Sequence, residues 1–522
     1  MLIYLALFLY LLTLAVLLFL RSRKKEEGQT WLAALFCCFA SFSMIFLSPL
    51  SGTVGDSPLV WFASGSLVLT FEPAWGDFDW LIMVLLSLGT LIYTLTSYLK
   101  REKKRFDGRT TSFFFITTMA GILTLTTQRL IFSPFLFFLL DCTQIFYQFS
   151  EDRELFSTRG QVIPLIIKLS SIILMGYTAV LVERTGQVDL SAINPMLLLT
   201  LIALLRLLAD FLQRITTPTA PDSKDRWMAL LHTVFLLKMF SVMQPSGPVN
   251  SSLNPIVIVQ VLLSAVMLYL WVMRPAEKTN DLFASGISIT LASACLFSGV
   301  REEMMVLVLP LFFIWMDRHV EEKNKNLHLF QVVIQSLFLI GAPFSPWYAL
   351  NESVAGNSLS FSGSIPLLVV EGLYLAGFIL HQTKGWNGKT LPDSERRASN
   401  ETDPLSWIKM ALLLAILIRG FVLPATWEVS GWLLYLPSVF LLFIPIYFLV
   451  NRKAGARVQT KPTYHISGLQ VVDKATQIIL VIVNIFRQIF EGLSALLEGD
   501  GGLVWAVILL ILLLTFYRGL VG

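Results

Sequence analysis

Charged residues are scarce in this chain of 522 residues. Only 14% of the residues are Asp, Glu, Lys or Arg, whereas 55% are hydrophobic, and the mean hydropathy is +0.70. Soluble domains carry about 25% charged residues, so this composition excludes a soluble globular protein. A membrane-spanning helix needs about 20 mostly apolar residues, and the chain holds roughly 14 to 16 such runs. We predict an all-α fold, a polytopic transmembrane helical bundle.

Cysteine and histidine are also rare, with four Cys and five His in all. No CxxC motif or Cys/His spacing typical of metal ligands occurs, which argues against a disulfide framework, an iron–sulfur cluster or a structural zinc site. We expect the cysteines to act as small apolar packing residues, and we expect no cofactor and no nucleic-acid partner. All of them lie within apolar runs: Cys37, Cys38, Cys142 and Cys295.

The basic residues are clustered, and their positions predict the orientation of the chain. The loop 51–79 carries acids but no Lys or Arg. Lys and Arg collect on the cytoplasmic side of membranes, which predicts an outside N-terminus and a multi-pass protein of the cell (inner) membrane. Because no basic segment precedes the first apolar run, we predict an uncleaved first span. The strongly basic clusters are residues 21–25, 100–105, 384–397 and 451–461.

The first eight predicted spans contain several ionisable residues at membrane depth. Asp141 lies in the fifth span, Arg206 in the seventh, and His232 and Lys238 in the eighth. A charge at the centre of a membrane helix costs at least about 2.5 kcal/mol, so such residues usually face a partner or an ion path. Two cations on consecutive spans require an anion, and Asp141 is the obvious candidate. A neutral carboxyl bonded to a nearby polar side chain is the alternative.

Other polar residues in these spans leave alternatives open. Lys168 in the sixth span can extend to the cytoplasmic surface or join a buried relay. Asp210 follows Arg206 by one helical turn, a spacing that permits an intrahelical pair. His232 and Lys238 are six residues apart and therefore lie on roughly opposite sides of their helix. Unlike lysine, arginine stays protonated at any accessible pH and cannot pass on a proton.

The rest of the chain contains one further acid inside a span. Glu371 lies near the centre of IPLLVVEGLYLAGFIL, whereas the apolar run 304–316 has only edge charges. Residues 337–353 combine prolines with Ser and Trp, which predicts irregular backbone lining a cavity. Residues 464–497 mix apolar runs with charges, so a helix along the membrane competes with another crossing.

The order of these features resembles the antiporter-like membrane subunits of the NADH:quinone oxidoreductase (complex I) family, with relatives in multisubunit cation/proton antiporters and membrane-bound hydrogenases. The phrase FFLLDCTQIF places Asp141 at the family's glutamate, and LLTLIALLRLLADF places Arg206 at its lysine. ALLHTVFLLKMFS offers His232 and Lys238, and IGAPFSPWYALNE corresponds to the family phrase GLPPFSGFxSK. The ending LLEGDGGLVWAVILLILLL also looks like the close of the larger members.

Several positions depart from the family pattern. Phe211 stands where the family has a helix-breaking proline, and the eleventh span (VLVLPLFFIW) lacks the expected central Lys or His. The lysine after GFxS falls near Leu350, with only Glu352 close by. The family's two halves are inverted repeats. The resemblance implies this division: 1–110, N-terminal helices; 111–245 and 246–381, two antiporter-like half-cores; 382–404, a cytoplasmic linker; 405–522, C-terminal helices with the amphipathic segment.

Our leading hypothesis is a divergent antiporter-like, proton-translocating membrane subunit of a respiratory complex, with other membrane subunits as partners and protons or Na+ as the moved ion. If it belongs to an enzyme, it is a cofactor-free subunit. Asp141 and Arg206 form a buried pair, Lys238 loads the proton, His232 is an auxiliary carrier and Glu371 a possible exit. Two alternatives are a non-conducting scaffold of the same fold, and an unrelated transporter or a membrane transferase for lipid-linked sugars.

Overall fold

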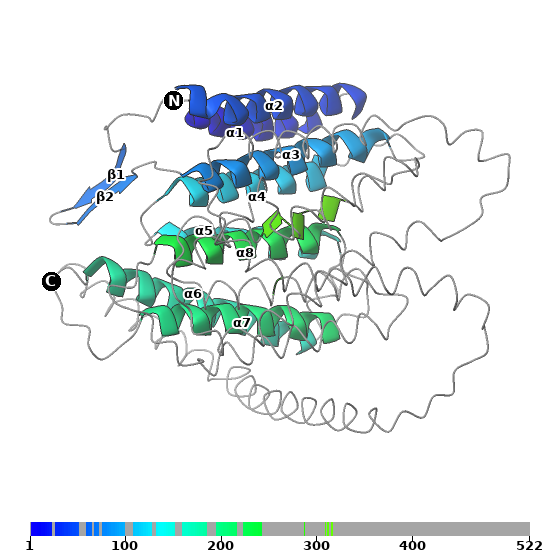
Figure 1. Cartoon of the computed structure of the whole chain (residues 1–522). Coiled ribbons are helices and arrows are strands. Elements are labelled where there is room, and N and C mark those ends of the chain that lie inside the picture. The colour runs from blue at the N-terminus through cyan, green and yellow to red at the C-terminus, as the bar shows by residue number, and fades with distance from the viewer. Residues whose placement is uncertain are drawn as a thin grey trace, which may run out of the picture.

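The computed structural model describes the chain up to residue 242, with gaps, and a few positions beyond it. Eight long helices account for most of the described part (Figure 1). They are α1 (Leu2–Ser22), α2 (Glu27–Leu47), α3 (Asp77–Leu99), α4 (Gly108–Thr126), α5 (Phe132–Glu151), α6 (Arg159–Arg184), α7 (Pro195–Thr216) and α8 (Ser223–Val242). The other described residues are 48–51, 59–64, 67–71, 76, 127, 287, 308, 309, 311, 312, 315 and 316.

The helices are built from the apolar runs that the sequence predicted as spans. In the described part, the segments 29–47, 79–97 and 164–182 are long and apolar enough to cross a membrane, and residues 2–17 form a shorter apolar helix. Helices satisfy their own backbone hydrogen bonds, which lipid cannot do, so an apolar run of this length is stable as a helix. The predicted transmembrane helical bundle is therefore confirmed, whereas the number of spans stays a prediction.

The helices pack side by side in a regular order, with α1 on α2, α2 on α3, α3 on α4, α4 on α5 and α6 on α7 (Figure 1). The last helix, α8, returns to contact α4, α5 and α7. Two tryptophans fasten α2 to α3 at both ends. Trp31 donates to the carbonyl of Thr94 at 2.8 Å, and Trp80 donates to the carbonyl of Ile45 at 2.9 Å.

The centre of the described bundle is densely packed where α3, α4 and α8 meet. A Cβ atom added at Gly89 of α3 would lie 2.8 Å from the Trp227 ring of α8. One added at Gly121 of α4 would lie 2.8 Å from Leu86 and 3.0 Å from Leu231. Gly121 therefore lets α4 lie close to α3 and α8, as small residues do in membrane proteins, and Gly89 leaves room for the Trp227 ring. The Trp227 indole also donates to the Thr117 hydroxyl at 3.1 Å.

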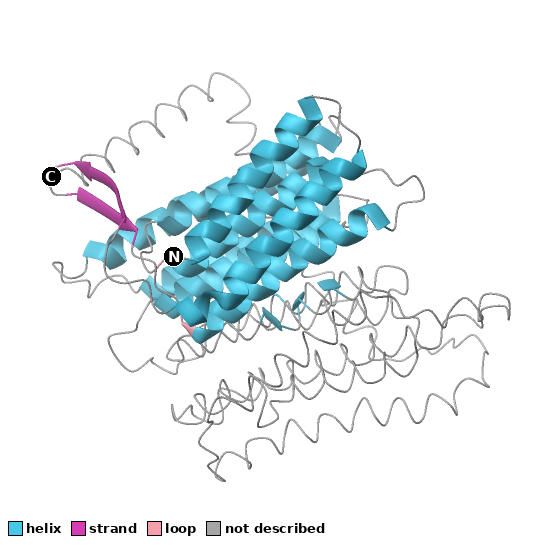
Figure 2. Cartoon of the chain, turned by 90° about the horizontal axis from the view of Figure 1, so that it is seen from above, coloured by secondary structure: helices cyan, strands magenta, loops and turns pink. Residues whose placement is uncertain are grey.

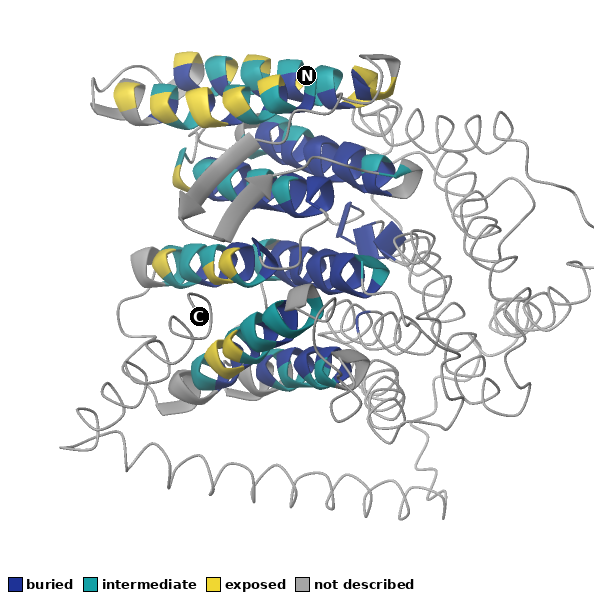
Figure 3. Cartoon of the chain, turned by 90° about the vertical axis from the view of Figure 1, so that its left-hand side faces the viewer, coloured by how far each residue is buried: buried dark blue, intermediate teal, exposed yellow. Residues whose placement is uncertain are grey.

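The two N-terminal helices present an apolar outer face, and Figure 3 shows exposed residues gathered along them. In lipid such a face needs no polar cover, since lipid tails are as apolar as leucine. The exposed large side chains of α1 and α2 are Leu5, Phe8, Leu11, Leu12, Phe19, Leu32, Phe36, Phe39, Phe46 and Leu47.

The segment between α2 and α3 includes the two strands of the described part. It contains an antiparallel hairpin of β1 (Leu59–Ser64) and β2 (Leu67–Phe71), which Figure 2 shows beside the helices. Val60 pairs with Thr70 and Phe62 with Leu69, with an irregular register between them. The β-branched and aromatic residues of VWFAS and LVLTF favour strands, so this small sheet is a local exception in a helical fold.

Several predicted features lie outside the described residues. They are Glu371, most of the predicted second half-core and its irregular segment 337–353, the linker 382–404, the C-terminal spans and the amphipathic segment 464–497. The division of the chain into two half-cores therefore stays a prediction.

Candidate functional site

A buried ion pair joins the middle of α5 to the middle of α7. Nη1 of Arg206 donates to both carboxylate oxygens of Asp141, at 2.7 and 2.9 Å. Both side chains are almost fully buried. Hydrogen bonds between charged groups are short and strong, and each charge offsets the cost of burying the other. The contact expected from the sequence is present, whereas a role in proton transfer stays a prediction.

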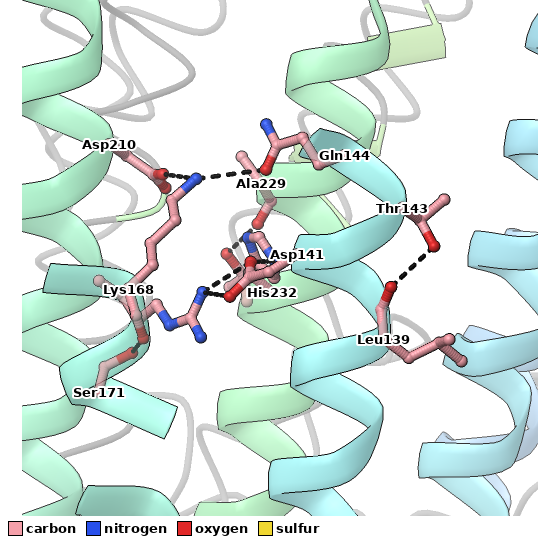
Figure 4. A network of polar contacts seen from close by, with 11 residues as sticks. Leu139, Asp141, Thr143, Gln144, Lys168, Ser171, Asp210, Ala229 and His232 are labelled. Carbon is pink, nitrogen blue, oxygen red and sulfur yellow. Dashed lines mark hydrogen bonds and ion pairs between the residues drawn. The ribbon is translucent and has the colours of Figure 1, made fainter. Parts of the chain in front are cut away.

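His232 of α8 is the third member of this cluster (Figure 4). Its Nε2 lies 3.1 Å from Oδ1 of Asp141, although its orientation does not give a well-formed hydrogen bond. Phe137, one turn before Asp141 on α5, stacks on the imidazole with ring centroids 5.6 Å apart. The Arg206 guanidinium lies 4.8 Å from the centroid of the same phenyl ring. Phe137 therefore packs against both Arg206 and His232, and an apolar neighbour of this kind strengthens electrostatic interactions.

The guanidinium retains unused donors. In the described part of the chain, Nε and Nη2 of Arg206 are buried and have no hydrogen-bond partner. Buried N–H groups are nearly always satisfied by protein or by ordered water. These two donors are therefore available to water or to a further acceptor.

A second polar contact lies next to the first and involves Lys168 of α6. Its ammonium donates to the Gln144 side-chain oxygen of α5 at 3.2 Å and lies 3.4 Å from Asp210 of α7 (Figure 4). This geometry corrects one sequence-based alternative, because Asp210 pairs with α6 and not with Arg206 on its own helix. The sequence allowed the Lys168 amine either to extend to the cytoplasmic surface or to be buried, and the structure shows it buried between helices.

A third polar cluster lies nearer the start of α8, so that the three clusters form a row of polar groups. Tyr147 of α5 shares its hydroxyl with Thr110 of α4 at 2.7 Å and accepts a short hydrogen bond from Lys224 of α8. Asp141, Gln144 and Tyr147 follow one another at intervals of three residues and so lie along one side of α5. Polar groups therefore extend from the start of α8 to the middle of the bundle.

Lys238 has a separate partner that the sequence did not suggest. Its ammonium lies 2.6 Å from Oδ2 of Asp79 in the first turn of α3, and both side chains are buried. The same carboxylate oxygen accepts the backbone N–H of Gly76 at 3.1 Å, which caps the helix. A carboxylate is favourable at a helix N-terminus because of the helix dipole. As predicted, His232 and Lys238 face different helices, α5 and α3.

The predicted site residues therefore fall into three groups. The structure brings together Asp141, Arg206 and His232, places Lys238 on Asp79, and does not describe the surroundings of Glu371. Sequence reasoning missed Asp79, which it assigned to the acidic outer loop, and it missed Gln144. Among the described residues, no group of three or more His, Cys, Asp or Glu could hold a metal ion.

Comparisons with known proteins identify the fold. Neither a protein-family model nor a curated protein sequence matches this chain. A chain of the Mrp complex from Dietzia sp. matches with a TM-score of 0.58 and 12% identity. That match covers all of this chain and 63% of the other, so the chain spans less than two thirds of its neighbour. A chain of respiratory complex I from Thermus thermophilus with bound aureothin has a TM-score of 0.49 and 14% identity, over 80% of this chain and 99% of the other. We conclude that this chain has the polytopic helical fold of the matched Mrp-complex chain.

Proposed function

We propose that this chain is a divergent antiporter-like subunit that moves protons through a multisubunit complex of the cell membrane. The observation that carries the proposal is the buried contact of Asp141 with Arg206 and His232, at the middle of three helices. Ionisable groups at membrane depth are costly and typically mark ion or proton paths. The moved ion and the partner subunits are part of the proposal, with protons favoured because the cluster contains an imidazole.

The mechanism follows from competition for one carboxylate. When Arg206 is bound to Asp141, the carboxylate charge is largely offset and stabilises a protonated His232 only weakly. When a partner subunit draws Arg206 away, the same carboxylate faces His232 alone and favours the imidazolium form. His232 then takes up a proton, and it releases that proton when Arg206 returns. Arg206 keeps its own proton throughout, because a guanidinium does not deprotonate in proteins.

The orientation of the chain is a further part of the proposal. Asp79 near the start of α3 contacts Lys238 near the end of α8, so these two helix ends lie on one side of the bundle. With the basic clusters inside, that side faces out, together with the N-terminus. The row from Tyr147 to Asp141 then begins at the cytoplasmic side.

Replacing Asp141 by Asn in the assembled complex, reconstituted in liposomes, tests this function. We expect proton translocation to fall at least about tenfold, since the amide no longer distinguishes the two protonation states of His232. Ser170→Ala is the matched control, because Ser170 is exposed and its hydroxyl bonds only to its own helix in the contacts seen. Unchanged pumping in assembled Asp141→Asn would defeat the proposal.

A non-conducting scaffold of the same fold is the second candidate function. The described residues of the eleventh-span segment are all apolar and buried: Val308, Leu309, Leu311, Phe312, Trp315 and Met316. Trp315 packs on Trp227 of α8 with ring centroids 4.8 Å apart, which is a packing contact and offers no proton site. His232→Gln discriminates between the two functions, because a scaffold would assemble and support turnover normally, whereas a conducting subunit would assemble and lose translocation.

A further inference from the structure

Lys168 is a buried lysine close to the Asp141 cluster, and its ammonium can release a proton. It comes from α6, and its ammonium contacts Gln144 of α5 and Asp210 of α7 (Figure 4). It lies close enough to Asp141 and His232 to interact with both electrostatically. The amine is therefore part of the same electrostatic unit as the Asp141 cluster.

Among the described residues, the charges of this unit balance. Arg206 and Lys168 supply two positive charges, Asp141 and Asp210 supply two negative charges, and a neutral His232 adds none. Adding one proton to such a unit leaves a buried net charge, which is costly in a low-dielectric environment. A proton is therefore accepted most easily when another leaves, so the unit favours an exchange in which one group loses a proton as another gains one.

Only part of the unit can take part in that exchange. A guanidinium does not release its proton, whereas a lysine ammonium and an imidazole can. Lys238 is bound to Asp79 on α3 and lies outside the unit. Among the basic side chains contacting Asp141 or Asp210 in the described part of the chain, this leaves His232 and Lys168 as proton carriers.

We propose that Lys168 is the amine that passes protons to the Asp141 cluster, while Arg206 only sets the electrostatic field. The proposal rests on the proposed function. The ammonium transfers its proton to the His232 imidazole by way of water, which leaves a neutral amine beside Asp210 and Gln144. When Arg206 returns to Asp141, His232 releases its proton, and a proton from the row that begins at Tyr147 and Lys224 restores the ammonium, so the unit has no net charge at the end of the cycle. No other bond is made or broken.

The decisive experiment separates charge from proton release. Lys168→Arg keeps a cation for Asp210 but removes a releasable proton, so we expect normal assembly and translocation at least about tenfold slower. Adding Arg206→Lys to this variant returns an amine to the site and is expected to restore most of the rate. A merely structural Lys168 predicts the opposite, with Lys168→Arg active and no benefit from the second change.

Measurements use the full chain in its complex in liposomes, with assembly checked by co-purification and Ser170→Ala as the control. If Lys168→Arg does not assemble, Lys168→Gln with Arg206→Lys is the deciding variant, and an assembled but inactive form overturns the inference. Wild-type translocation by assembled Lys168→Arg also overturns it. If Asp141→Asn abolishes translocation in that same series, only the inference fails; if Asp141→Asn is fully active, the proposed function fails as well.

Discussion

Arginine at position 206 gives the site a permanent charge where a lysine would give a variable one. The guanidinium places one nitrogen on both oxygens of Asp141 and keeps two other nitrogens buried. Its planar, delocalised charge suits buried pairs with carboxylates better than a compact ammonium does. The positive charge of the pair therefore does not vary with pH.

The first prediction concerns this pair. Arg206→Met leaves Asp141 without its principal cation inside the bundle, so we expect the free energy of unfolding to fall by about 3–5 kcal/mol. Chemical unfolding of the purified chain in lipid bicelles measures the change. Combining Arg206→Met with Asp141→Asn removes both charges and is expected to recover part of the loss. Equal stability of Arg206→Met and the unaltered chain would contradict a structural contribution from the pair.

The residues of the site differed in how far they could be predicted. The Asp141–Arg206 contact could be predicted because a buried charge requires an opposite charge, and few acids were available in the spans. Asp79 could not, because it lies within the first turn of a helix whose exact start sequence patterns do not resolve. Whether Asp210 pairs with Lys168 or with Arg206 depends on how α6 and α7 are rotated against each other. Spacing along one helix does not determine that rotation.

At the scale of the helices, glycine sets the distance between α3 and α8. The Trp227 ring occupies the space that a side chain at position 89 would need, and its indole is held by Thr117 of α4. Three helices are thus fixed by one aromatic residue at a position where α3 has no side chain. Packing of this density tolerates added volume poorly.

Two alanine substitutions test this packing. Gly89→Ala forces the Trp227 ring to move, and we expect a loss of about 1–3 kcal/mol in stability from overpacking. Gly176→Ala on α6 is the matched control, because a Cβ there meets no atom within 4 Å, and alanine is the better helix former. In detergent, the melting temperature of Gly89→Ala should therefore fall, whereas that of Gly176→Ala should stay the same or rise. A harmless Gly89→Ala would show that α3 and α8 are more loosely packed than the structure indicates.

The helices themselves were largely predictable, and the hairpin was not. Runs of about 20 apolar residues correspond to α1 through α8 because the length of a span is imposed by the bilayer. The aromatic residues between α2 and α3 are equally typical of membrane interfaces and of strands, so composition alone did not separate these structures. Packing order was not predictable either, since the return of α8 to α4 and α5 depends on contacts between distant segments.

For the whole molecule, the fold and the apolar outer face of α1 and α2 are those expected of a protein embedded in a membrane. The matched neighbour is a chain of a complex, and our proposal extends that setting to this protein. After extraction from native membranes in a mild detergent, we expect a tagged chain to co-purify with other membrane subunits in stoichiometric amounts. Mass spectrometry of the purified material, with untagged cells as the control, measures this. A chain that elutes alone and moves protons alone would contradict the assembly.

The helix α8 carries two acid contacts at different heights, His232 with Asp141 and Lys238 with Asp79. Six residues separate the two basic side chains, which corresponds to about 9 Å along the helix axis. A helix is stiff over that length, so a tilt or slide that stretches one contact also strains the other. A displacement of the start of α3 would therefore be transmitted along α8 to the contact with Asp141. No chain of charged residues is needed between the two contacts.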